Sequence, residues 1–249
     1  MKEYKEANIK TRELNKSKLR LLRFNFLIIG FLMIGCKGDE LTLPVFSENL
    51  TLPTFSENIV FEEFNQDCDW ELKQTDAASM TLENGGLVVE KFQKSTENNF
   101  CLWYAKNIET FDTSSDFSME FDVEIIEGSQ DYIAEFDIAW GQISGKEKSF
   151  YQFTLSDKGV CRINKFDNTI DGKYWSYLKE ITLLNVNEGD VNHINIIQHQ
   201  GEMLVMFNEK EIFEFQTSTV QGEDIGFITC QKVKWQLDNL KITDKVLPQ

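Results

Sequence analysis

Short runs in which apolar and polar residues alternate dominate the chain from residue 59 onward. The clearest runs lie within residues 116–166 and read DFSMEFDVEIIEG, YIAEFDIAWG, SFYQFTLSDKG and VCRINKF. A period of two residues is typical of β-strands with one buried face. Because successive side chains point to opposite faces of a strand, Phe121 and Phe136 are expected to face a core. Asp122 and Asp137 are then expected to face outward.

Turn signals separate further runs of this kind along the rest of the chain. A polar residue precedes glycine at intervals from Asn84-Gly85 to Gln221-Gly222, and no amphipathic helical stretch lies between. Short strands at this spacing predict an all-β fold, an antiparallel two-sheet jelly-roll sandwich. We expect one such domain over residues 59–243, followed by a short tail, residues 244–249.

The N-terminal segment has the pattern of a targeting signal. Residues 1–23 carry eight Lys and Arg, and an apolar run follows from Phe24 to Gly35. The run is too short to span a bilayer, which takes about 20 apolar residues, and it fits the apolar region of a secretory signal peptide. Met33-Ile34-Gly35-Cys36 resembles the lipobox of bacterial lipoproteins. The resemblance implies a signal peptide over residues 1–35 and lipidation of Cys36; an ordinary signal peptide with an incidental cysteine is the alternative.

The residues after Cys36 bear on location. Lys37-Gly38-Asp39-Glu40 resembles the surface-export signal of Bacteroidetes lipoproteins. The resemblance implies an outer-membrane lipoprotein on the cell surface, with a periplasm-facing protein as the alternative. Residues 36–58 also hold two copies of a nine-residue repeat, LTLPVFSEN and LTLPTFSEN. Two copies are too few for a solenoid, so we interpret residues 36–58 as the acylated cysteine and a tether.

The charge of the chain excludes one class of partner. The formal net charge is −16, and the chain without residues 1–35 has 17 basic and 38 acidic residues, a charge of −21. A protein this acidic repels the phosphates of nucleic acids. The membrane is therefore expected as a partner only through the lipid anchor.

The order of several local motifs carries a family resemblance. The motifs are Phe61, Phe64 and Trp70, the NGGLVV run after Glu83, Asp116-Phe117-Ser118, Ala139-Trp140-Gly141, Tyr151-Gln152-Phe153, the Asn192–Asn208 strand pair, Ile225-Gly226-Phe227 and Leu237-Asp238-Asn239-Leu240. Together they resemble the concanavalin A-like lectin/glucanase superfamily, and its laminin-G-like modules in particular. The resemblance implies two curved sheets with ligands on the concave sheet or its rim loops, and it leaves the activity open. Asn208-Glu209 stands where Asn-Gly is usual.

One strand of the predicted domain resembles a catalytic motif. Glu120, Asp122 and Glu124 match the E-x-D-x-E strand of the glucanases in this superfamily, which implies Glu120 as nucleophile, Glu124 as general acid and Asp122 as their modulator. Residues i and i+4 of a strand are about 13 Å apart at the backbone, whereas retaining hydrolysis needs carboxyl groups about 5 Å apart. The same pattern also describes a charged outer face, so we assign no catalytic residue.

A second acidic strand adds Glu135 and Asp137. If the two strands pair, up to five carboxylates share one face, and like charges opposite each other destabilise a sheet. Arg162, Lys232 and Lys234, or a bound Ca²⁺ with oxygen ligands, would offset that charge. No other cofactor is expected.

Exposed aromatic side chains are candidate sugar contacts, because the apolar faces of sugar rings stack on them beside polar groups. The options are Trp103, Tyr104, Tyr132, Tyr174, Trp175 and Tyr177, of which Tyr174 and Trp175 in a predicted loop are preferred. Trp70, Trp140 and Trp235 fall on inward phases. The candidate ligand-binding residues are Glu120, Asp122, Glu124, Glu135, Asp137, Gln152, Arg162, Tyr174 and Trp175.

Four cysteines remain once Cys36 is set aside, namely Cys68, Cys101, Cys161 and Cys230. They allow three pairings, and their positions favour Cys68 with Cys101 and Cys161 with Cys230. Free buried thiols are the alternative.

Together these features predict a surface-anchored lipoprotein whose lectin-like sandwich binds glycan or another extracellular polymer without catalysis. A glucanase-like hydrolase using Glu120 and Glu124 is one alternative. A structural or protein-adhesion module is the other.

Overall fold

A computed structural model of the chain describes residues 55–64, 70–92, 101–128, 133–168, 175–183 and 186–246. The chain divides into two units, residues 1–50 and 51–249, and all described residues belong to the second. The predicted signal peptide, the predicted lipidation site Cys36, Cys68, Tyr132 and Tyr174 lie outside the described residues.

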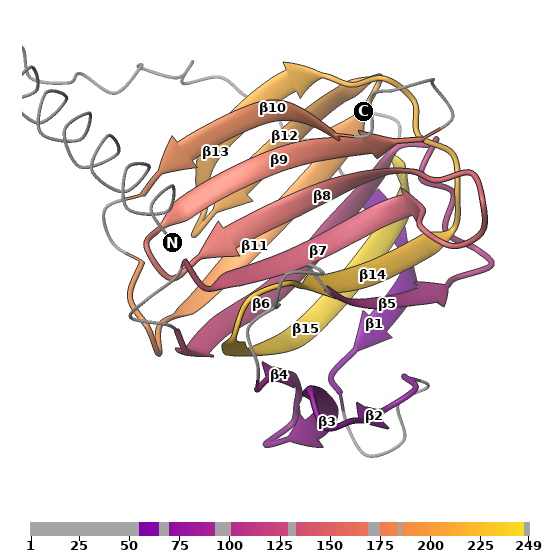
Figure 1. The fold of residues 1–249 in the computed structure, drawn as a ribbon. Coiled ribbons are helices and arrows are strands. Elements are labelled where there is room, and N and C mark those ends of the chain that lie inside the picture. The colour runs from indigo at the N-terminus through magenta and orange to yellow at the C-terminus, as the bar shows by residue number, and fades with distance from the viewer. Residues whose placement is uncertain are drawn as a thin grey trace, which may run out of the picture. The chain divides into compact units, whose positions relative to one another are not determined.

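The described residues form two antiparallel sheets (Figure 1). Sheet A contains, in spatial order, β13 (Lys210–Gln216), β12 (Glu202–Phe207), β11 (Val191–His199), β6 (Phe117–Glu127), β15 (Val233–Val246), β4 (Gly86–Lys91), β3 (Ala78–Glu83) and β2 (Lys73–Gln74), and β1 (Phe55–Glu62) pairs with β15. Sheet B contains β10 (Trp175–Thr182), β9 (Val160–Asp167), β8 (Ser149–Ser156), β7 (Glu135–Gln142), β14 (Asp224–Thr229) and β5 (Leu102–Asn107).

The two sheets lie one in front of the other, so the predicted all-β sandwich is confirmed (Figure 1). The described residues contain no helix, and therefore none long and apolar enough to cross a bilayer.

Alternate residues of both sheets meet in a shared core. The Phe136 ring of sheet B contacts Phe121 and Trp235 of sheet A, at centroid distances of 5.7 and 4.9 Å. On β6, the five residues predicted from the period of two to face the core are all buried, Phe117, Met119, Phe121, Val123 and Ile125; Ser118, on the outward phase, is buried as well. Trp70, Trp140 and Trp235 are also buried, as predicted.

Tight turns connect neighbouring strands through left-handed residues. Asn84 and Gly85, between β3 and β4, have φ angles of 53° and 81°, as the type I′ hairpin turn requires. Asn208 and Glu209, between β12 and β13, adopt 47° and 66°. Glu209, which stands where glycine is usual, therefore still adopts the left-handed backbone conformation of such a turn.

The sheet extends beyond the predicted domain limits at both ends. Phe55 pairs with Val246, and Glu57 pairs with Asp244. Strand β1 thus begins inside the second copy of the predicted tether repeat, and β15 continues into the predicted tail. Each segment is a weak strand signal alone, and their mutual pairing supplies the backbone hydrogen bonds that each lacks.

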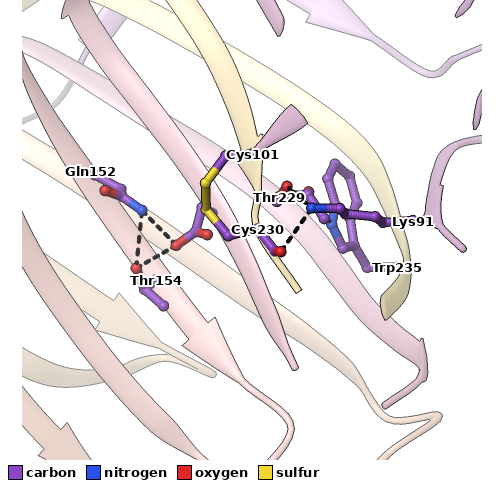
Figure 2. The surroundings of a disulfide bond; sticks show 8 residues. Lys91, Cys101, Gln152, Thr154, Thr229, Cys230 and Trp235 are labelled. Atoms are coloured by element: carbon purple, nitrogen blue, oxygen red, sulfur yellow. Dashed lines mark hydrogen bonds between the residues drawn. A yellow bond between two sulfur atoms is a disulfide. The ribbon is translucent and has the colours of Figure 1, made fainter. Parts of the chain in front are cut away.

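The disulfide differs from the favoured pairing. Cys101 bonds to Cys230, with an S–S distance of 2.07 Å, because the β5–β14 register pairs Leu102 with Thr229 and so brings the next residues together. Figure 2 shows Lys91 beside this bond; its Nζ donates a hydrogen bond to the Cys230 carbonyl at 2.7 Å. The predicted Cys161–Cys230 bond is wrong: Cys161 is a buried free thiol in the core, where burial raises its pKa to about 12.

Candidate functional site

The predicted acidic residues do not share one face. Strand β6 belongs to sheet A and β7 belongs to sheet B, so Glu120, Asp122 and Glu124 face away from the core on one side of the sandwich. Glu135 and Asp137 face away from it on the other. The prediction of a shared patch of five carboxylates is therefore wrong. Its premise was that consecutive strands pair, whereas the connection after β6 crosses to the opposite sheet.

The acids of β6 lie among complementary groups on the outer face of sheet A. Lys241 Nζ is 3.9 Å from Glu120 Oε2. Asp122 accepts a hydrogen bond from Asn239 Nδ2 at 2.7 Å, and its other carboxylate oxygen is 2.9 Å from His193 Nδ1. These contacts resemble those of a solvated charged face, in which each acid finds a nearby donor.

The outer face of sheet B carries a continuous row of aromatic rings. Phe150 on β8 stacks on Phe166 of β9 at 5.0 Å, and it makes edge-to-face contacts with Trp103 and Trp175 at 5.7 and 5.9 Å. Phe166 and Trp175 are 5.0 Å apart. The row therefore runs from β5 to β10. The small residue Ala139 lies in the same apolar cluster as Phe150, which leaves room for that ring.

Trp175 ends this row at an exposed edge. It opens strand β10 rather than lying in a loop as predicted, and it is 46% exposed. Tyr177, two residues further along the same face, is 76% exposed. Tyr104, a predicted option for ligand contact, is instead buried and 5.6 Å from the Trp70 ring.

A polar row lies next to the aromatic row. The strand registers place Gln152 opposite Asn164, and Asn164 opposite Tyr177. Asn164 is only 7% exposed, and its Oδ1 atom has no hydrogen-bond partner among the described residues. An unpaired buried acceptor is uncommon and calls for an explanation.

Asp137 is the buried acid of this face. It is 3% exposed, and its Oδ1 accepts hydrogen bonds from Gln152 Nε2 at 2.7 Å and from Thr154 Oγ1 at 2.5 Å. Gln152 and Thr154 lie on one side of the disulfide in Figure 2. Burial raises the pKa of Asp137 to about 7; the neighbouring Glu135 carboxylate acts in the same direction, and the two hydrogen bonds act against it.

An ion-pair cluster borders the polar row. Arg162 donates from Nε to Glu180 at 2.8 Å and from Nη1 to Glu135 at 3.3 Å. Its guanidinium carbon is 5.9 Å from the centre of the Tyr177 ring. Burial raises the pKa of Glu135, and Arg162 offsets part of that rise. Arg162 thus neutralises acids as predicted, although only those of sheet B.

No metal centre is formed by the described residues, since none of their His, Cys, Asp and Glu side chains gather in groups of three that could hold an ion. A hollow of about 620 Å³ has Ser149 and Asp167 in its lining, and these residues stand on the strand phase opposite to that of Phe150 and Phe166.

Comparisons with known proteins bear on the fold. No family model matches the chain, and no curated protein sequence matches it. A protein of unknown function with a galectin-like fold from Bacillus subtilis superposes with a TM-score of 0.59 and 11% identity, over 79% of this chain and 100% of that one. A β-glucanase from Bacillus licheniformis gives 0.55 and 11%, over 76% and 99%. The described domain has the concanavalin A-like lectin/glucanase fold. At this identity the likeness shows the lectin/glucanase fold alone.

Five of the predicted contact residues share the outer face of sheet B: Glu135, Asp137, Gln152, Arg162 and Trp175. Sequence reasoning missed Asn164, Phe150 and Phe166. The sequence did contain a signal for the two rings. Phe150 and Phe166 occupy outward positions on strands whose inward positions are already apolar. Large rings on both faces of a strand indicate a second buried or binding surface.

Proposed function

We propose that this protein is a lipid-anchored, surface-exposed protein whose sandwich binds glycan on the outer face of sheet B without hydrolysing it. One observation carries the proposal: exposed Trp175 ends an aromatic row directly beside the buried polar side chains of Gln152 and Asn164. Sugar rings present apolar faces to aromatic rings and hydroxyl groups to neighbouring polar atoms, and this face offers both.

The neighbouring polar groups support recognition rather than catalysis. Two of them, Gln152 and Thr154, already donate to Asp137, so their positions are fixed before a ligand arrives. A site whose polar groups are held in place loses less conformational entropy on binding.

Hydrolysis by Glu120 and Glu124 is the weaker alternative, although the β-glucanase shares the fold. These residues lie on the opposite face from the aromatic row, and they line neither the hollow of about 620 Å³ nor the one of about 340 Å³. Glu120 is beside Lys241, and Asp122 is engaged by Asn239.

Binding is tested with the full chain in detergent on a glycan array, followed by affinity electrophoresis in gels containing the best polysaccharides. Trp175→Ala should weaken binding at least tenfold, which is about 1.4 kcal/mol. Val191→Ala, which shortens an exposed side chain on sheet A, is the control and should leave affinity unchanged. Equal behaviour of the two variants would contradict the proposal.

Hydrolysis is tested in parallel by measuring reducing ends released from the same polysaccharides. We expect none. Release that Glu120→Gln abolishes would establish the hydrolase in place of the binding protein.

The anchor is tested by Cys36→Ala, which should move the protein from the membrane fraction to the soluble one, because the short apolar run before it cannot span a bilayer. Protease added to intact cells should degrade the wild-type protein. Protection would favour a periplasm-facing location.

A further inference from the structure

The site on sheet B contains an acceptor atom to which no described residue donates. Asn164 Oδ1 is buried without a hydrogen-bond partner among the described residues. Its neighbours across the sheet are Gln152, whose amide group is engaged with Asp137, and Tyr177. An unpaired buried acceptor costs stability, and a ligand O–H or N–H group placed against it would remove that cost.

Arg162, a cation of the same site, is already engaged with two acids. Arginine recognises carboxylates and sulfates by directing a fork of N–H donors at two oxygens. In Arg162 the Nε and Nη1 donors point to Glu180 and Glu135. Two carboxylates flank one guanidinium, so an incoming anion meets two engaged donors and a net negative charge.

We infer that the site selects uncharged glycans: Asn164 accepts a hydrogen bond from a ligand hydroxyl, while Glu135 and Glu180 exclude uronate- and sulfate-bearing glycans by holding Arg162. This inference rests on the proposed function and adds the ligand class. Specificity of this kind combines one attractive group, the Asn164 acceptor, with repulsive groups, the carboxylates of Glu135 and Glu180 that hold Arg162.

The experiment uses the full chain in detergent and affinity electrophoresis against two sets of polysaccharides. The neutral set is β-glucan, xylan, galactan and mannan, and the anionic set is polygalacturonate, alginate and heparin. Wild type should bind at least one neutral polymer and none of the anionic ones. A preference for anionic polymers overturns the inference and leaves glycan binding standing. Failure to bind any polymer overturns the proposed function itself.

The role of the Arg162 ion pairs with Glu135 and Glu180 is tested by the double variant Glu135→Gln with Glu180→Gln, which removes both carboxylates that hold Arg162. Affinity for anionic polymers should rise at least tenfold. The matched control is Glu188→Gln with Glu214→Gln, which removes the same charge at two exposed positions elsewhere. If the control gains as much affinity for anionic polymers, net charge alone excludes anions. The proposed role of the Arg162 ion pairs would then be wrong.

The acceptor is tested by Asn164→Leu and Asn164→Asp. The leucine variant removes the unpaired acceptor, so its melting temperature should rise by a few degrees while its affinity for the neutral polymer falls at least tenfold. The aspartate variant keeps an acceptor at the same place and should retain binding. If the leucine variant binds as well as wild type, Asn164 does not contact the ligand.

Discussion

Two strands of this protein carry nearly the same tetrapeptide and give it opposite environments. Glu120-Phe121-Asp122-Val123 lies on β6, and Glu135-Phe136-Asp137-Ile138 lies on β7. In both, the apolar residues enter the core and the acids face outward. The Asp122 side chain is 25% exposed and meets His193 and Asn239. Asp137 is 3% exposed, and burial raises its pKa to about 7.

The difference lies in the neighbouring strands. Around Asp122, the opposing residues on β11 and β15 are His193 and Asp238, and the face stays open to solvent. Around Asp137, β8 contributes Thr154 at the same level and Gln152 beside it. An exposed, paired acid is typical of a solvated face. A buried acid with a shifted pKa beside an aromatic row is typical of a functional site.

The largest expected effect concerns the aromatic row. Phe150→Ala should lower the free energy of unfolding by about 3–5 kcal/mol, as a core Phe would, although Phe150 lies outside the sheet-to-sheet core. Val191→Ala, on the outer face of sheet A, should cost under about 0.5 kcal/mol. Urea unfolding followed by tryptophan fluorescence measures both. Similar small losses would mean that the outer face of sheet B is no more packed than that of sheet A.

The next effect is a pH dependence. The folded-state pKa of Asp137 is raised to about 7 from an ordinary value of 3.8, so the folded state binds more protons than the unfolded state between these values. The wild-type free energy of unfolding should therefore fall as pH rises from about 4 to about 7. The groups that set this pKa are Glu135, Thr154, Gln152 and Arg162.

Asp137→Asn keeps an acceptor for Gln152 and Thr154 and removes the charge. It should be more stable than wild type at pH 8, by on the order of 2 kcal/mol, and should lose this advantage near pH 4. Asp122→Asn should be no more stable than wild type at pH 8, because it weakens the contact with His193. Urea unfolding of wild type and both variants at pH 8 and pH 4 measures these differences in the free energy of unfolding. A gain from Asp122→Asn as large as that from Asp137→Asn would erase the contrast between the faces.

The smallest expected effect is a coupling energy. Because Asp122 and Asp137 lie on opposite outer faces, their stability effects should add within about 0.5 kcal/mol in a double-mutant cycle at pH 8. Coupling well above that value would support the shared acidic face predicted from the sequence.

The predictability of the fold follows from the range of each interaction. The period of two decides which residues of β6 and β7 face the shared core, so their phases could be predicted locally. Sheet membership depends on partners far along the chain, such as Ile194 opposite Phe121. The tetrapeptides of β6 and β7 are nearly identical, so no local pattern could tell which sheet each would join.

The candidate site shows the same limit. Glu135, Asp137, Gln152, Arg162 and Trp175 were identified by residue type, since acids, amides and aromatics suit glycan contact. The importance of Asn164 arises because its Oδ1 atom has no hydrogen-bond partner in the described part of the chain, which only a three-dimensional arrangement reveals. The Cys101–Cys230 bond likewise follows from the β5–β14 register.

A crystal structure of the protein with the oligosaccharide repeat of its best-binding polysaccharide would test the central claim most directly. We expect a sugar ring stacked on Trp175, with a hydroxyl group within hydrogen-bond distance of Asn164 Oδ1. A sugar bound across Glu120 and Glu124 on sheet A, with the outer face of sheet B empty, would contradict the account.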